Sequence, residues 1–585
     1  MTVNSVAIDR IPRFDRDFFG SDRLASCIGR GEIGGKASGL LFAGDTMRRA
    51  FPGIAWGELE ISIPRMVVIT TEVFDAFMVR NDLYGIAYSD APDHRIAHAF
   101  QQGEFPPEFV DDLRGLVEGV HSPLAVRSSS LLEDALFRPF AGVYHTKMTP
   151  NNQPDRENRF RRLVEAVKLV WASTFFAAPK RYIRTTDRRI EDEKMAVLVQ
   201  EAVGRRHGDR FYPDVSGVAR SYNFYPASGT EHDEGVVNLA LGLGKQIVDG
   251  GLSWFYPPAR PRTPPPFGST RDQLEHTQTR FWAVNMGEHF AYDPVGEEEY
   301  LVRCGLEQAE ADGSLRYLVS TYDPASDRLT PGLEDGGARV LNFAPLLSRY
   351  AFGFNHAVSR LLQVSRMALG GPVEIEFATT LPRGDETRAR LGFLQVRPML
   401  VEGGDSVVSD EELARSDVVL ASSRVIGNGT DQTITDIVYV CPGTFDASVT
   451  REIAAEIERI NGSLVDERRP YLLIGFGRWG TSEPWLGIPV SWDKISGARV
   501  IVEATLPTML TEMSQGSHFF HNLTSFKVSY LMVSHHDTPG VNWDWLEAQP
   551  AETETAHMRH LRLSKPLLVM VDGVSRRGVI RWGAK

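Results

Sequence analysis

The sequence predicts a chain of the α/β (α+β) class, and three stretches carry that prediction. Residues 371–400, GPVEIEFATTLPRGDETRARLGFLQVRPML, alternate in polarity like two strands joined by a polar turn. Residues 29–50 run from a glycine-rich loop into apolar residues at helical spacing, and residues 436–476 give a strand, a helix and a second strand. A chain of 585 residues is too long for one hydrophobic core, so we expect about two to four domains.

The composition is ordinary for a soluble globular protein, with 42% hydrophobic and 24% charged residues. A net charge of −13 argues against a broad surface for nucleic acid or anionic membrane. The three cysteines are far apart and form neither a disulfide framework nor a CxxC metal site. The opening MTVNSVAIDR lacks a signal-peptide pattern, and no window is long and apolar enough to span a membrane. We therefore expect a cytoplasmic protein.

The two strands of residues 371–400 place four polar side chains on shared faces. Residues two apart in a strand point to the same side, which groups Glu374 with Glu376 and Gln395 with Arg397. Two carboxylates, an amide and a guanidinium suit Mg²⁺ ions that carry phosphates. An exposed strand face with cross-strand ion pairs is the alternative that this stretch alone leaves open.

Lys36 stands at the start of the helix predicted within residues 29–50. Backbone N–H groups beside the preceding glycines and the ammonium group would meet an anion there. The stretch is not a P-loop, because Arg30 replaces its first glycine and Ala37 stands where Ser or Thr would bind Mg²⁺. A solvated lysine near a helix start is the alternative.

Residues 122–148, SPLAVRSSSLLEDALFRPFAGVYHTKM, give a second polar cluster. Leu124–Val126 are predicted to form a short buried strand, followed by a loop that holds Arg127 and three serines. A guanidinium and hydroxyls at the end of a strand make a natural grip for phosphate.

Five motifs in one order resemble a known family. They are GGKASGL, IPRMVVITTEVF, PLAVRSSSLLEDALFRPFAGVY, MAVLVQEAV and FLQVRP, within residues 25–400. Together they resemble the ATP-binding half of the phosphoenolpyruvate synthase / pyruvate phosphate dikinase family, which has an ATP-grasp fold. The resemblance implies ATP and Mg²⁺ as cofactors.

The resemblance also implies roles for individual residues. The matching lysine and arginine, Lys36 and Arg127, hold the nucleotide phosphates. The acidic pair and the Gln-x-Arg strand hold metal and phosphate, with Glu374, Glu376 and Gln395 as the metal ligands. Lys36, Arg127 and Arg397 are the catalytic candidates in this half, and the cofactor-binding set is Lys36, Arg127, Arg138, Gln200, Lys245, Glu376, Gln395 and Arg397.

Two members of that set depart from the family's pattern. Arg138 precedes Phe-Ala-Gly, where the family more often has small residues. Lys245, in NLALGLGKQIVDGGLSWFYPP, stands where a glutamate of the nucleotide pocket is usual. Lys245 either holds an extra phosphate or marks a site that has drifted from catalysis.

The resemblance and composition together predict the domain organisation. Residues 1–215 and 216–402 are expected to form the two ATP-grasp subdomains. Residues 403–417 are polar, acidic and glycine-containing, which is typical of a linker. Residues 418–585 are expected to form a smaller α/β domain with a phosphoryl-acceptor or substrate role.

One glycine-rich stretch in the smaller domain fits a nucleotide motif only in part. Residues 475–480, GFGRWG, match G-x-G-x-x-G after a strand, but Pro484 and Pro489 interrupt the helix that should follow. We therefore reject a dinucleotide site. A tight loop that exposes Arg478 and Trp479 to an anion or a planar ring stays open.

The sequence says least about which residue accepts the phosphoryl group. In the resembled family a histidine in a Gly-rich Ser-His loop carries the phosphoryl group to a C-terminal barrel, and this chain has no room for a barrel of about 250 residues. The nearest match to that loop is residues 514–521, SQGSHFFH, in which His518 follows a Gly-Ser pair. Neutral imidazole is a competent nucleophile, so His518 is the acceptor candidate. A buried or capping histidine is the alternative.

A metal site in the same region also stays open. It would use His518, His521, His535 and His536, although no spacing among them is diagnostic.

Three functions remain. The first is an ATP-dependent phosphotransferase of the kinase or dikinase type, acting through a phosphohistidine on an unknown acceptor. The second is a catalytically altered, ATP-binding regulatory or assembly subunit, which Lys245 and the missing barrel favour. The third is a small-molecule phosphotransferase whose acceptor pocket lies in residues 418–585. A separate partner protein and a homo-oligomer stay open.

Overall fold

The protein is described by a computed structural model that covers residues 11–50, 55–56, 58–130, 142–184, 189–224, 226, 230–263, 265, 269–287, 291–348, 351–399, 401, 407–481, 483–507, 519, 523, 526–573 and 575–583. Contacts divide the chain into two units. Unit 1 comprises Met1–Ile183, Asp187–Ile247 and Leu252–Met399, and unit 2 comprises Arg184–Thr186, Val248–Gly251 and Leu400–Lys585. Both combine helices with mixed sheets, so the predicted α/β class is confirmed.

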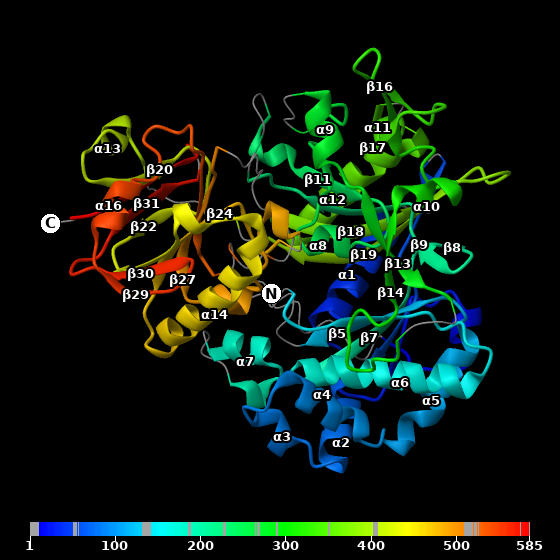
Figure 1. Cartoon of the computed structure of the whole chain (residues 1–585). Coiled ribbons are helices and arrows are strands. Elements are labelled where there is room, and N and C mark those ends of the chain that lie inside the picture. The colour runs from blue at the N-terminus through cyan, green and yellow to red at the C-terminus, as the bar shows by residue number, and fades with distance from the viewer. Residues whose placement is uncertain are drawn as a thin grey trace. The chain divides into compact units, whose positions relative to one another are not determined.

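The first sheet of unit 1 has its strands in the order β1 (Ala25–Ile28), β4 (Met66–Ile69), β7 (Met195–Glu201), β5 (Leu124–Ser130) and β6 (Thr146–Thr149). A layer of helices belongs to it, seen in blue to cyan in Figure 1: α2 (Thr71–Arg80), α3 (Tyr84–Tyr88), α4 (Asp93–Gln102), α5 (Val110–Gly119), α6 (Arg156–Ser173) and α7 (Ala177–Arg184). α6 packs on β5, β6 and β7. Its fully buried Trp171 also packs against Phe74 and Phe77 of α2.

β5 is longer than the sequence predicted. The prediction ended this strand at Val126 and placed the following arginine and serines in a loop, whereas the strand continues to Ser130. Ser128–Ser130 pair with Met195–Val197 of β7, and all three serines are buried. Three successive serines show no alternation of polarity, so the partner strand rather than the local sequence extends β5.

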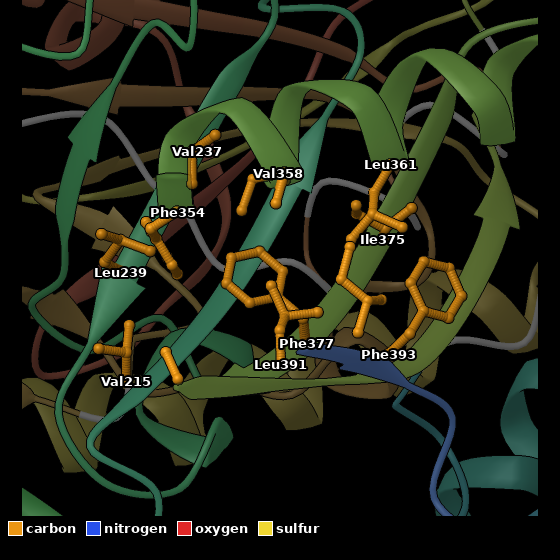
Figure 2. Packing of buried hydrophobic residues seen from close by; sticks show 14 of the residues in the cluster. Val215, Val237, Leu239, Phe354, Val358, Leu361, Ile375, Phe377, Leu391 and Phe393 are labelled. Carbon is orange, nitrogen blue, oxygen red and sulfur yellow. The ribbon is translucent and has the colours of Figure 1, made fainter. Parts of the chain in front are cut away.

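The second sheet of unit 1 is seven-stranded and carries the polar hairpin. Its order is β12 (Trp254–Tyr256), β11 (Val236–Ala240), β10 (Val215–Arg220), β18 (Val373–Thr380), β19 (Ala389–Pro398), β3 (Leu59–Ser62) and β2 (Ala55–Trp56). Figure 2 shows α12 (Phe354–Leu369) laid across one face, with Phe354, Val358 and Leu361 turned toward the strands. Along β18 and β19 the polar residues alternate with the apolar residues that face α12. The polar residues therefore lie on the opposite face of the sheet.

The buried face of this sheet fixes the hairpin in place. Phe377 is 1% exposed, and its ring lies so close to Gly217 on β10 that a Cβ there would come within 2.1 Å of Cζ. Glycine is therefore required beside this ring. Burying a single side chain of this size stabilises a fold by about 1.5–3 kcal/mol, so the core dictates which face of the hairpin points inward.

The described residues of unit 1 also contain two smaller sheets and five further α-helices. One sheet has the order β14 (Leu301–Gly305), β13 (Arg280–Asn285), β9 (Arg210–Tyr212) and β8 (Arg205–His207), and the other β16 (Arg328–Pro331), β15 (Val319–Asp323) and β17 (Ala338–Leu341). The helices are α1 (Gly34–Ala50), α8 (Lys245–Val248), α9 (Thr270–His276), α10 (Leu306–Ala311) and α11 (Ala344–Ser348).

Unit 2 has two main sheets that share one hydrophobic core. The larger has the order β21 (Val425–Ile426), β28 (Ser529–Val533), β27 (Ala498–Ala504), β24 (Tyr471–Phe476), β23 (Asp436–Val440), β30 (Met558–Arg562) and β29 (Ala551–Glu554). The smaller has the order β20 (Val418–Ser422), β32 (Arg577–Arg581), β31 (Leu568–Asp572) and β22 (Gly429–Asp431). β25 (Arg478–Trp479) pairs with β26 (Gly487–Ile488), and the helices are α13 (Asp410–Leu413), α14 (Thr450–Asp466) and α16 (Trp543–Ala548).

The predicted linker is folded where the structure describes it. Residues 407–417 include α13, and Val408 and Leu413 pack against Val418 and Val579. Arg577 pairs with Asp410 at 2.7 Å. This segment is therefore part of unit 2, and its acidic residues serve ion pairs rather than solvation alone.

Asp436 anchors the start of β23 in unit 2. It is fully buried, its Oδ1 lies 2.7 Å from His560 Nε2, and its Oδ2 accepts hydrogen bonds from Thr435 Oγ1 at 2.9 Å and Arg469 Nε at 3.2 Å. Burial alone would raise the pKa of Asp436, but the bonds from His560, Arg469 and Thr435 outweigh it and lower the pKa below its ordinary value.

Replacing Asp436 by Asn should destabilise unit 2 by about 3 kcal/mol, the lower end for breaking a buried ion pair, because the Arg469 side chain keeps 15% exposure. Since folding lowers the pKa of Asp436, its contribution is present above the unfolded pKa of about 3.9 and is lost as the pH falls below it. Urea unfolding with hydrogen exchange of β23 peptides measures both effects.

The exposed Asp466→Asn is the matched control for this variant. Equal unfolding free energies for the two variants, or a gap between wild type and Asp436→Asn that does not shrink at low pH, would contradict the assignment.

Candidate functional site

The β18–β19 hairpin brings the four polar residues predicted from the sequence into two adjacent rows. Glu374 pairs with Arg397 and Glu376 pairs with Gln395 in the antiparallel register. The apolar residues between them lie in the core on the other side of the sheet. The faces expected for these residues are therefore observed.

A β-bulge next to this pairing creates a contact for Arg127. The register shifts after Glu376, so that Phe377 pairs with Phe393. Leu394 is the extra residue of β19 and is not paired with a residue of β18. Arg127, on β5 of the first sheet, donates from Nη1 to the Leu394 carbonyl at 3.1 Å and from Nη2 to Gln395 Oε1 at 2.6 Å. Nη2 also lies 3.6 Å from Glu376 Oε2. The side chains of Arg127 and Glu376 are 13% and 15% exposed, so the pair is mostly shielded from water.

Glu374 is deeper in the sheet than Glu376 and binds two arginines. Its Oε1 accepts hydrogen bonds from Arg397 Nε at 2.8 Å and from Arg397 Nη2. Its Oε2 accepts one from Arg220 Nε at 2.6 Å. The sequence reasoning missed Arg220, which ends β10. A charged residue two positions after Val218, at the end of a strand with no other charged residue, was the available signal.

Lys36 lies where the glycine-rich loop meets the first sheet. Its Nζ lies 3.0 Å from Ser128 Oγ of β5. Its helix, α1, packs on both β5 and β19, and a Cβ on Gly39 would stand 3.3 Å from the Val396 carbonyl. Arg127 of the N-terminal third thus contacts the acidic hairpin directly, and α1, which carries Lys36, packs on β19 of the same hairpin.

The loop before α1 is held by hydroxyl groups of neighbouring segments. Thr70 Oγ1 accepts from Gly31 N at 3.1 Å and Thr71 Oγ1 accepts from Glu32 N at 2.9 Å. Ser129 donates to the Ile33 carbonyl at 2.8 Å and accepts from Ala37 N at 3.1 Å. These bonds within the protein fix the position of the start of α1 without a ligand.

Two other candidates lie outside this cluster. Gln200 is buried in β7 and donates to the Pro64 carbonyl at 3.3 Å. Lys245 begins α8, where its ammonium lies 3.1 Å from Glu298 Oε1 and 5.9 Å from the centre of the Trp282 ring. A carboxylate and a ring face therefore stabilise the charge of Lys245. Arg138, His518 and His521 fall outside the described residues.

The structure corrects the expectation that Arg478 and Trp479 are exposed. Arg478 is 5% exposed and Trp479 is fully buried. The Trp479 indole donates to the Val502 carbonyl at 3.2 Å and covers Gly475, where a Cβ would come within 2.2 Å of the ring. The hydrophobic ring packs onto the parallel strands β24 and β27 because glycine leaves space there, so this tryptophan is not a substrate contact.

The donor set at the hairpin fits Mg²⁺. Glu376 and Gln395 supply carboxylate and amide oxygens, and Mg²⁺ often uses one or two carboxylates together with substrate phosphates rather than a cage of protein ligands. In the part of the chain that the structure describes, no group of three or more His, Cys, Asp and Glu residues is arranged for a metal. No helix in those residues is long and apolar enough to cross a membrane.

An α/β unit whose basic side chains converge on carboxylate and amide oxygens has the chemistry of a site for nucleotide phosphates. Residues 30–417 match the family model described as the pyruvate phosphate dikinase AMP/ATP-binding domain. This is more than half of the 585 residues, and the chain belongs to that family. The resemblance inferred from the ordered motifs is confirmed for this half.

Two curated proteins are similar to part of the chain. Phosphoenolpyruvate synthase of Aeropyrum pernix is 28% identical over an alignment of 269 residues that covers 42% of this chain and 28% of that protein. The Uncharacterized phosphotransferase YvkC of Bacillus subtilis is 26% identical over 197 residues, which are 33% of this chain and 21% of that protein. The matched region thus spans less than a third of either relative.

Gly34→Ala should disturb the contact between α1 and β5. Gly34 has a φ of +74°, and an added Cβ would lie 1.7 Å from the Ser129 carbonyl oxygen, which is backbone and cannot move aside. We expect a loss of more than about 1 kcal/mol of unfolding free energy together with weaker ATP binding. Urea unfolding of the protein, followed by hydrogen exchange in peptides from unit 1, measures the unfolding free energy. Calorimetric titration with ATP measures the binding.

Gly85→Ala in α3 is the control, because a Cβ there would meet nothing within 4 Å. Equal behaviour of the two variants would show that the close approach of Gly34 does not organise the loop.

Proposed function

We propose that unit 1 binds Mg·ATP in the manner of an ATP-grasp domain and that the protein transfers a phosphoryl group from it. The observation that supports this most is the contact of Arg127 with Gln395 and Glu376, because it joins residues from two distant motifs at one site. Membership of the AMP/ATP-binding family supports the nucleotide as ligand.

In this proposal the basic residues offset the charge of the triphosphate as it is attacked. Lys36 lies at the start of α1, Arg127 on the first sheet and Arg397 on the second, so the three basic groups of the proposed site come from different elements. Glu376 and Gln395 would hold Mg²⁺, which supplies charge neutralisation at the phosphate oxygens. Gln200, Lys245 and Arg138 remain proposed contacts of the nucleotide.

Lys36→Ala and Arg127→Ala should each lower ATP turnover by about 10²–10³, the scale for removing one preorganised electrostatic group. Nucleotide turnover should be followed by product analysis, because AMP with phosphate indicates dikinase chemistry and ADP alone indicates a kinase or ATPase. The exposed Arg95→Ala of α4 controls for the loss of a positive charge. Unaltered turnover in both test variants would remove these residues from the mechanism.

We further propose His518 as the phosphoryl acceptor in unit 2. In the transfer an imidazole nitrogen forms a bond to phosphorus while a phosphoanhydride bond of ATP breaks, and the nucleotide leaves with the electron pair as ADP or AMP. Ser514–Gly516 before Ser517-His518 support the assignment, because they resemble the family's Gly-rich Ser-His loop.

Incubation with β- and γ-labelled ATP should then leave an acid-labile, base-stable label on the wild-type protein, and His518→Ala should lose it. His536→Ala, which alters an exposed histidine of the same unit, should keep the label. Retention of the label in His518→Ala would exclude His518 and leave direct transfer to an unknown acceptor.

One observation favours a second function, an ATP-binding regulatory or assembly subunit. Lys245 stands where the family's glutamate is usual, and its ion pair with Glu298 supports a site whose charge differs from the family's pattern. Tight ATP binding without AMP, ADP or protein-bound phosphate, even with candidate partners present, would select this function.

A further inference from the structure

Arg220, Glu374 and Arg397 form one row across three adjacent strands. Arg220 on β10 pairs with Glu374 on β18, and Glu374 pairs with Arg397 on β19. The three residues are 4%, 2% and 2% exposed, so this row is an interior feature of the second sheet. Charged groups at such depth require close partners, because they lose hydration that only ion pairs and hydrogen bonds replace.

The two oxygens of Glu374 are divided between the two arginines. Arg220 donates from Nε to Oε2 at 2.6 Å, and Arg397 donates from Nε to Oε1 at 2.8 Å and from Nη2 to the same oxygen. Two donors from one guanidinium define the plane of Arg397, whereas a single contact would leave it free to turn.

We propose that Arg220 is a positioning residue, and that it acts through Glu374 to hold Arg397 in the orientation needed at the phosphate site. Glu374 is then a bridge between two arginines rather than a ligand of Mg²⁺. This inference rests on the proposed function, because Arg397 is the group that would contact phosphate. It reassigns the role that the resemblance implied for Glu374.

The electrostatics of the row support this division of roles. A divalent cation at Glu374 would be repelled by the two guanidiniums that already bind its oxygens. Glu376 differs, because it lies one row further along, is 15% exposed and has Arg127 at 3.6 Å. Metal binding is therefore assigned to Glu376 together with the second lone pair of the Gln395 amide oxygen, which already accepts a hydrogen bond from Arg127 at 2.6 Å. Orientation of Arg397 is assigned to the row of Glu374 and Arg220.

The test separates catalytic turnover from the requirement for Mg²⁺. Arg220→Gln and Glu374→Gln should each lower kcat by about 10–100-fold, the usual effect of removing a partner that orients a functional group. Both should leave the Mg²⁺ concentration for half-maximal activity within about twofold of wild type, whereas Glu376→Gln should raise it by about 10–100-fold. Arg220→Lys, which keeps the charge but not the directed Nε bond, should fall between wild type and Arg220→Gln.

The double variant gives a second, independent readout. If Arg220 acts only through Glu374, combining Arg220→Gln with Glu374→Gln should cost no more than the worse single variant, because both remove the same support of Arg397. Should Arg220→Gln fail to fold, as judged by circular dichroism, Arg220→Lys and Glu374→Gln carry the comparison. Full additivity, or unchanged kcat in Arg220→Lys and Arg220→Gln, would overturn the positioning role.

Metal binding distinguishes this inference from the proposed function itself. Mn²⁺ titration in the presence of ATP, followed by electron paramagnetic resonance, does not depend on turnover. If Glu374→Gln keeps the Mn²⁺ affinity of wild type while Glu376→Gln loses it, Glu374 is not a ligand even in a protein that binds ATP without turning it over. Equal loss in the two variants would overturn the inference, and absence of ATP-dependent Mn²⁺ binding in wild type would overturn both proposals.

Discussion

The contact between Arg127 and the β18–β19 hairpin is the interaction on which the candidate site depends. It links the first sheet of unit 1 to the second through the Leu394 carbonyl, Gln395 and Glu376. The β-bulge makes it available, because it shifts the Leu394 carbonyl out of the regular pairing. Charge-assisted bonds at low exposure are strong and directional, so they align the basic side of the site with its carboxylate side.

The rigidity of the hairpin comes from its apolar face. Ile375, Phe377 and Phe393 pack against α12 and the neighbouring strands (Figure 2), which fixes the register. Because side chains alternate along a strand, a slip of one residue would turn the carboxylates into the apolar core and the phenylalanines onto the polar face of the sheet. The hydrophobic core thus determines where the carboxylates point, and the site needs no flexible loop to present them.

The hairpin could be predicted from the sequence, because a period of two fixes the faces of Glu374, Glu376, Gln395 and Arg397 wherever the strands lie. Features set by distant partners could not. The extension of β5 through three serines depends on β7, and the burial of Trp479 depends on the space above Gly475. Arg220 escaped notice for the same reason, since its partner Glu374 is 154 residues away.

The charge balance explains why single motifs in this chain are weak evidence and their combination is strong. Lys36 and Arg127 lie on segments that are distant in the chain from the hairpin that carries Glu376, and each segment alone also fits an ordinary surface ion pair. The net charge of −13 does not oppose a polyanion here, because charges more than about 8 Å away are largely screened at physiological ionic strength. What matters is the local assembly, and unit 1 produces it only when α1, β5 and the hairpin pack together.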